Sequence, residues 1–332
     1  MPSWTQASNA TKALPETPAP VAEDISTNEA NGRSAFAVSA NGVLAYRGGA
    51  MSQEAHLAWR DRHGTRLTAI GKPGVYQSVR LSPDERSAQL SVGFRLNLAI
   101  MDLATGVLTS ATTDGTAFNA LGPWSPDSQR IIIHRAYFSK LLEFSVASGK
   151  AREIPETEGL LANDWTADGK LLLYNGRKGT QFGVLPAEGG PPRVVSETPY
   201  AKTTFRLSRD GKFVAYMSNE STGPQIVVAT FPSFSEKQQV SVDGGWSPAW
   251  RKDGRELFFV GPTHLMSVDI RTEPRIEAAA PQPLFRFAAR SLNASQYAAA
   301  GDGKRFLVID RPEQGAQADT MVVVNWTAGL KE

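Results

Sequence analysis

Short apolar runs, separated by polar and turn-forming residues, make up most of the chain. The stretch from Thr166 to Tyr174 is representative, because a small polar residue, an Asp-Gly turn and a Lys lead into the apolar run Leu171–Tyr174. The same order of residues returns from Ser208 to Tyr216. Apolar residues do not recur at the spacing of about 3.6 residues that marks an amphipathic helix. The pattern therefore predicts an all-β protein built from short strands.

The turn between the polar residue and the strand is repeated along the chain. Its central Asn or Asp, called the marker below, occurs at Asn41, Asp84, Asp127, Asp168, Asp210, Asp253 and Asp302. Successive markers lie 43, 43, 41, 42, 43 and 49 residues apart. A period of about 40–45 residues with several short strands per unit is typical of β-propeller blades. The sequence predicts a seven-bladed β-propeller of four-stranded antiparallel blades, with six blades as the alternative.

The marker turn has a structural explanation. Pro or a small residue fits its first position, Asp can accept hydrogen bonds from nearby backbone N–H groups, and Gly supplies the positive φ that reverses the chain. The second and third repeats carry Glu85 and Ser128 where Gly is expected, so those turns are expected to be strained or of another type. A Trp precedes the turn at one fixed position in three repeats, which favours packing between blades over ligand stacking; these are Trp124, Trp165 and Trp250.

The two ends of the chain are expected to meet in the last blade. Residues 1–18 contain few large apolar side chains and are predicted to be a disordered leader, which leaves 19–332 as a single propeller domain. The final repeat has Met321–Trp326 as its third strand and no fourth strand before Glu332. Because a closed ring has no free strand edge, the isolated strand Val21–Ile25 is expected to lie beside Met321–Trp326.

The repeated turn before an apolar strand resembles that of the TolB-type, WD-repeat-like propellers. Three stretches resemble, more narrowly, the C-terminal propeller of bacterial serine/threonine protein kinases: Phe36–Tyr46, Trp250–Phe258 and Val324–Leu330. This resemblance runs from about residue 20 to the end and implies a role in kinase-linked signalling. The sequence has no Gly-rich loop, His-Arg-Asp motif or Asp-Phe-Gly motif, so kinase activity is not implied.

Composition narrows the function classes. A net charge of +2 argues against a dedicated nucleic-acid-binding domain, which usually concentrates basic residues. The chain has no cysteine, which excludes disulfides, thiolate metal sites and cysteine nucleophiles. No apolar run approaches the roughly 18–20 residues of a membrane span. The compartment stays open: cytoplasmic for the chain as written, extracytoplasmic if it derives from a membrane-anchored kinase.

Residue types that carry chemistry are sparse and scattered. The four histidines fall in different repeats without metal-ligand spacing, and one Asp per turn supplies too few oxygen ligands for calcium; the histidines are His56, His63, His134 and His264. A Gly-x-Ser-x-Gly nucleophile motif does not occur. We therefore expect no catalytic residues, no metal and no cofactor. A propeller enzyme of the lyase or lactonase type is kept as an alternative.

Binding is expected on the face opposite the marker turns. In a propeller, the loops between blades and those between second and third strands share one face, called the loop face below. Basic and aromatic residues in these loops suit an acidic protein or peptide partner, although long loops collect charge in any case and a mixed solvated rim is the alternative; the candidates are Arg135, Tyr137, Arg177, Lys178, Tyr200 and Trp246. The sequence thus predicts a monomeric, non-catalytic interaction module. A sensor domain of a serine/threonine kinase system is the second hypothesis.

Overall fold

The chain forms strands and turns. The computed structural model describes residues 22, 25, 27–28, 33–47, 54–93, 97–111, 121–135, 140–287, 295–311 and 320–324. These residues form 30 strands and no helix, and so none of them belongs to a helix that could cross a membrane. The chain divides into two compact units, Gln53–Pro312 and a smaller one of Met1–Ser52 with Glu313–Glu332. The predicted all-β fold is confirmed.

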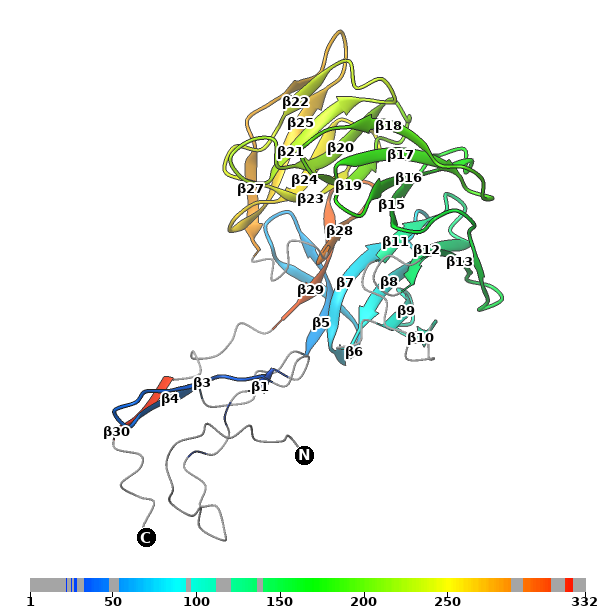
Figure 1. Ribbon diagram of the computed structural model, residues 1–332. Coiled ribbons are helices and arrows are strands. Elements are labelled where there is room, and N and C mark those ends of the chain that lie inside the picture. Colours follow the sequence, from blue (N-terminus) through cyan, green and yellow to red (C-terminus); the bar gives the residue numbers. More distant parts are fainter. Residues whose placement is uncertain are drawn as a thin grey trace. The chain divides into compact units, whose positions relative to one another are not determined.

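The larger unit contains six antiparallel sheets, which we number as blades 2–7 after the marker that each contains (Figure 1). Blades 2 and 3 consist of β7–β10 (Tyr76–Leu81, Ser87–Val92, Asn97–Asp102, Leu108–Ser110) and β11–β14 (Leu121–Trp124, Arg130–Arg135, Lys140–Ser145, Ala151–Glu153). Blades 4 and 5 consist of β15–β18 (Leu160–Trp165, Leu171–Gly176, Gln181–Pro186, Arg193–Glu197) and β19–β22 (Lys202–Leu207, Phe213–Ser218, Gln225–Thr230, Lys237–Gln239).

The last two blades depart from the simple pattern. Blade 6 has five strands, because both β26 and β27 pair with β25; its members are β23–β27 (Trp246–Trp250, Glu256–Val260, His264–Arg271, Glu277–Ala278, Gln282–Arg286). Blade 7 combines two distant parts of the chain, β28 and β29 (Tyr297–Ala299, Arg305–Asp310) with β5 and β6 (Ala55–Asp61, Arg66–Gly74). N-terminal strands therefore do close a blade, as predicted, and they are β5 and β6; the pairing expected for Val21–Ile25 falls mostly outside the described residues and stays a prediction.

The described part of the larger unit is a closed ring of six blades. The first strands of consecutive blades contact one another from β7 through β11, β15, β19 and β23 to β28, and β28 contacts β7. Across this last contact the Val79 N–H donates to the Ser295 carbonyl at 2.8 Å. Of the seven repeats expected from the markers, six therefore build the ring, which is the count given by the six-bladed alternative. The repeat of Asn41 belongs to the smaller unit.

The smaller unit contains a three-stranded sheet with β4 in the centre. Its strands are β3 (Phe36–Val38), β4 (Val43–Arg47) and β30 (Thr320–Val324), and a separate pair is formed by β1 (Thr27–Asn28) and β2 (Arg33–Ser34). Met321 lies opposite Tyr46, so β30 pairs with β4. Most of Val21–Ile25, the leader 1–18 and residues 325–332 lie outside the described residues, and the leader stays a prediction.

Burial explains why blade 7 closes through β5. Leu57 and Ala58 of β5 are fully buried, and the register places Ala58 opposite Val308 and Trp59 opposite Leu307. Leu57, Trp59 and Leu307 belong to one apolar cluster that also holds Val79 and Leu90 of blade 2. The closing strand thus adds to the sheet of blade 7 and to the core between blades 7 and 2.

The marker turns differ in how they reach positive φ. Gly169 and Gly211 have φ values of 74° and 71°, and Glu85 and Ser128 adopt 61° and 62° in the equivalent position. The turn type is thus retained, and the two non-glycine residues carry the strain that the sequence predicts. Both side chains bond to the neighbouring blade: Glu85 Oε1 accepts from the Gly301 N–H at 2.7 Å, and Ser128 Oγ accepts from the Asp84 N–H at 3.1 Å.

Gly211 offers a test of the backbone requirement. A Cβ at this position would meet no atom within 4 Å, so only the left-handed φ of 71° opposes a side chain. We expect Gly211→Ala to lower the free energy of unfolding by about 1 kcal/mol. Gly211→Asn should cost less, because Asn tolerates this conformation. Urea unfolding of the three proteins checks the order, and equal stability of all three would contradict it.

Candidate functional site

The marker face is held together by local hydrogen bonds. In blade 4, Asp168 accepts from the Thr166 hydroxyl at 2.6 Å and from the Lys170 N–H at 3.0 Å. These two bonds lower the pKa of Asp168, the first having the larger effect. Asp210 and Asp302 accept from the N–H groups of Lys212 and Lys304 at 3.1 and 2.9 Å. Each of these carboxylates is thus engaged within its own turn.

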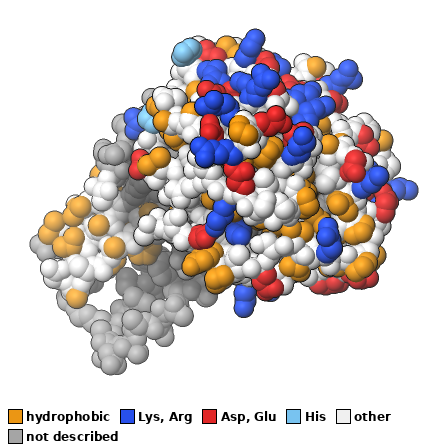
Figure 2. Space-filling view, turned by 90° about the horizontal axis from the view of Figure 1, so that it is seen from above, with side chains coloured by type: hydrophobic (Ala, Val, Ile, Leu, Met, Phe, Trp, Pro, Cys, Tyr) orange, Lys and Arg blue, Asp and Glu red, His pale blue; other side chains and the backbone are white. Residues whose placement is uncertain are grey.

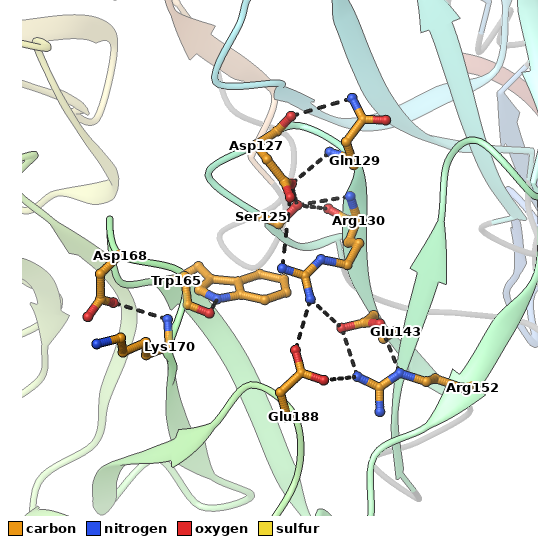
Figure 3. A network of polar contacts seen from close by, with 11 residues as sticks. Ser125, Asp127, Gln129, Arg130, Glu143, Arg152, Trp165, Asp168, Lys170 and Glu188 are labelled. Atoms are coloured by element: carbon orange, nitrogen blue, oxygen red, sulfur yellow. Dashed lines mark hydrogen bonds and ion pairs between the residues drawn. The ribbon is translucent and has the colours of Figure 1, made fainter.

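Charged side chains also connect neighbouring blades on this face (Figure 3). The Arg130 guanidinium of blade 3 lies over the Trp165 ring of blade 4, 5.0 Å from the ring centroid. It pairs with Glu143 and with Glu188 at 3.3 Å each, and Arg152 reaches Glu188 at 3.1 Å. Trp165 is 5% exposed, so it packs between blades. The charged groups of this network bond to one another across the boundary between blades 3 and 4. Their role is therefore structural.

On the loop face, backbone hydrogen bonds join the loops of three consecutive blades. The Lys202 N–H donates to Gly179 in the turn 176–179 of blade 4 at 2.8 Å. The Ala201 N–H donates to the Asn219 side chain at 2.7 Å, and the Gly245 N–H donates to Pro224 at 3.0 Å. These bonds link the segments 176–179, 198–201, 219–224 and 242–246, which we call the loop arc.

The loop arc contains four of the six residues that the sequence singled out. Arg177 and Lys178 are exposed at the tip of their turn. Tyr200 is 43% exposed. Trp246, the first residue of β23, is half-buried, and its buried Nε1 has no hydrogen-bond partner among the described residues. The loop arc therefore brings two basic side chains and two aromatic rings to one series of connected loops.

The remaining two candidates, Arg135 and Tyr137, lie partly or wholly outside the described residues. Arg135 is the last residue of β12, opposite Lys140 at the loop-face end of blade 3. Its side chain and all of Tyr137 lie outside the described residues. Their assignment to the binding face stays a prediction.

The loop arc is mixed in character. Val242 is 70% exposed, and Glu220 pairs with Lys237 at 2.8 Å. Lys178 makes no ion pair among the described residues. On the face seen in Figure 2, Lys and Arg side chains are interspersed with Asp and Glu. Exposed apolar, aromatic and charged groups lying together are a composition that suits protein contacts.

A second group of charged residues lies inside the ring, and the sequence analysis missed it. Arg80 of β7 and Arg206 of β19 come from blades 2 and 5, on opposite sides of the ring, and both donate to the Asn163 carbonyl of β15, at 2.8 and 2.9 Å. Asp164 lies 3.6 Å from Arg80 and accepts from the Leu207 N–H at 2.8 Å. We call Arg80, Asp164 and Arg206 the channel cluster.

Strand irregularity creates this cluster. In β15 the register shifts between Ala162 and Asp164, so Asn163 is an extra residue and its carbonyl is free to accept from the two arginines. The first strands of blades 2, 3, 5 and 6 shift at comparable places. The register shift in β19 includes Thr204, a β-branched residue at φ 56°, whose buried Oγ1 has no partner among the described residues. Such strain is often found at functional sites.

The channel cluster carries two positive charges against one negative charge. Burial and the charge of Arg206 lower the pKa of Arg80 to about 9, although Asp164 acts in the opposite direction. Burial also lowers the pKa of Arg206, again against the effect of Asp164. Because a guanidinium remains protonated at neutral pH, these shifts mean that the interior of the ring compensates the two cations only in part.

A sequence signal for the cluster does exist. Each of the three residues stands four positions before a marker, since Arg80, Asp164 and Arg206 precede Asp84, Asp168 and Asp210. The equivalent residues of the other ring blades are uncharged: Pro123, Ala249 and Ala298. Comparing this position between repeats would have identified the charges, but it could not have shown that they meet.

Histidines and acidic residues do not gather in the described part of the chain. His134 is buried in β12, and its Nε2 accepts from the Ala162 N–H at 3.0 Å, which connects blades 3 and 4. His264 contacts the Thr263 hydroxyl at 2.9 Å. Within the described ranges, no group of three or more His, Cys, Asp or Glu is placed to hold a metal ion.

Comparison with known proteins defines the fold. No family model and no curated protein sequence matches the chain. Among solved structures, a TolB protein from Agrobacterium tumefaciens is 17% identical, with a TM-score of 0.59 over 78% of this chain and 99% of that one. An oligogalacturonate lyase in complex with manganese is 14% identical, with a TM-score of 0.53 over 84% and 96%.

The β-propeller domain of Cps50 (Swd1) from Myceliophteria thermophila is 10% identical, with a TM-score of 0.50 over 65% of this chain and 74% of that one. At these identities the likeness concerns the fold alone. The fold is a TolB-like β-propeller, as the sequence resemblance implied. The narrower kinase resemblance stays a prediction.

Proposed function

We propose that this TolB-like propeller is a non-catalytic interaction module that binds a protein or peptide partner through the loop arc. The observation that supports this most is the connection of the loops of blades 4, 5 and 6 by backbone hydrogen bonds. Such bonds fix the loops before a partner arrives, which reduces the entropy lost on binding. The exposed rings and charges of the loop arc are thereby presented in one arrangement.

Within this proposal, the partner carries acidic groups that face Arg177 and Lys178. Both are exposed at the tip of one turn, and Lys178 has no ion pair among the described residues. The half-buried Trp246 and the exposed Tyr200 supply the aromatic contact that interfaces favour. Binding of this kind weakens as salt rises, because exposed charges are screened. We propose that the chain itself is a monomer.

Photocrosslinking tests the proposal. Tyr200 is replaced by p-benzoylphenylalanine, and Lys170, which is exposed on the marker face, receives the same residue as a matched control. In an extract of the source organism, we expect one dominant covalent product from position 200 that weakens at high salt. Equal products from positions 200 and 170, or none from position 200, would show that the loop arc is not the binding surface.

Enzymatic activity is the second candidate function. The likeness to an oligogalacturonate lyase with manganese favours it, whereas the described histidines and carboxylates are spread over different blades. A stoichiometric metal in the purified protein, together with cleavage of a polyuronide, would support this function over the first. A role as a kinase-linked sensor is compatible with the interaction module, and a kinase encoded next to this chain would favour it.

A further inference from the structure

We propose that the channel cluster is a binding site for a carboxylate, held between Arg80 and Arg206 inside the ring. The site is distinct from the loop arc and does not depend on the partner proposed there. It rests on the placement of two guanidiniums from opposite blades at one carbonyl oxygen, with a single carboxylate to balance them in the described part of the chain.

Donors remain available at this site. Arg80 donates through Nη2 only, and Arg206 through Nη1 to the Asn163 and Phe205 carbonyls. The Nε and Nη1 atoms of Arg80, and the Nε and Nη2 atoms of Arg206, have no partner among the described residues. A guanidinium offers its donors in a planar fork that matches the two oxygens of a carboxylate.

The excess positive charge of the channel cluster also favours the binding of an anion. Asp164 is 3.6 Å from Arg80 and uses its other oxygen for the Leu207 N–H, so it is shared between structural and electrostatic roles. The Arg80 side chain is only 15% exposed. A cation so enclosed gains little from water, and a bound anion would restore the balance at the place where the protein leaves it positive.

An unpartnered polar atom lies next to Arg206. Thr204 is in the register shift that leads into Arg206, and its buried Oγ1 has no partner among the described residues. The left-handed φ of Thr204 recurs at Ser247 in the equivalent shift of blade 6. The backbone conformation therefore belongs to the repeated bulge, and the unpartnered hydroxyl is the feature found beside the arginine.

The carboxylate can come from a free small acid or from the C-terminus of a peptide. Acetate represents the first source, and Ala-Ala-Ala as free acid and as C-terminal amide represents the second. Binding to the full chain is measured by titration calorimetry and thermal unfolding, with chloride at the same ionic strength as reference. We expect stabilisation by acetate or by the free acid and none by the amide. Tighter binding of the free acid than of acetate would identify a peptide terminus.

Variants locate the site. Arg80→Gln should weaken binding about tenfold or more, because a charge-assisted hydrogen bond is lost. Arg206→Lys keeps the positive charge but removes the planar guanidinium, and it should weaken binding to a similar extent. This second variant keeps the test valid if the Arg80→Gln protein does not fold. Arg209→Gln, on an exposed residue of the marker turn, should bind as the unchanged protein does. Stabilisation by chloride to the same extent, or full binding by the Arg80 and Arg206 variants, would overturn the proposal.

Discussion

Replacing Phe205 with alanine is expected to lower the free energy of unfolding by about 4 kcal/mol. Phe205 is fully buried, and its ring stacks on Phe182 of blade 4 with the centroids 3.9 Å apart. The ring of Tyr216 also stacks on Phe205, with the centroids 5.2 Å apart. The substitution would leave a cavity between blades 4 and 5, where neither sheet can move inward without breaking the ring.

Urea unfolding followed by tryptophan fluorescence measures this loss. Phe205→Leu keeps most of the volume and should cost less than about 1.5 kcal/mol. Phe36→Ala is the matched control, because Phe36 of the smaller unit is 51% exposed and its removal should change stability by less than about 0.5 kcal/mol. A Phe205→Ala protein as stable as the control would show that the two blades do not pack as described.

Asp164→Ala is expected to cost about 3 kcal/mol, because it removes the only carboxylate among the described residues that faces Arg80 and Arg206. The variant leaves two guanidiniums at the Asn163 carbonyl and also removes the acceptor of the Leu207 N–H. Addition of Arg80→Met should recover part of the loss, since the remaining arginine no longer meets a like charge. The two single variants and the double variant form a thermodynamic cycle.

The cycle distinguishes electrostatics from packing. A coupling of about 1 kcal/mol or more between positions 80 and 164 is expected for a partly buried pair. Strict additivity would show that Asp164 acts only through the Leu207 N–H. In that case the carboxylate of Asp164 would not stabilise the positive charge of Arg80.

Much of the fold follows from the repeated turn. The markers at Asp84, Asp127, Asp168, Asp210 and Asp253 locate five blades, because an Asp at this place accepts N–H groups of its own turn whatever surrounds it. The closure of the ring was not predictable in the same way. The strand Ala55–Asp61 carries no marker turn, and its pairing with Arg305–Asp310 depends on burial decided by contacts far apart in sequence.

The two candidate sites also differ in how far the sequence predicts them. The loop arc follows from the alternation of strand directions, which places Arg177, Lys178, Tyr200 and Trp246 on one face once the blades are recognised. The channel cluster depends on the register of β15, where a single extra residue turns the Asn163 carbonyl toward two arginines. Hydrophobic periodicity carries no information about such a shift, because the buried residues on either side remain buried.

Closure of a six-bladed ring by β5 and β29 is the claim on which both sites depend. Because the chain has no cysteine, an Ala58→Cys/Val308→Cys protein contains a single possible disulfide between two residues that lie opposite each other. We predict that oxidation during expression links these positions, and that the link raises the thermal midpoint until a reductant is added, because it closes a long loop. Failure of this pair to link in a protein that is otherwise folded would contradict the six-bladed closure.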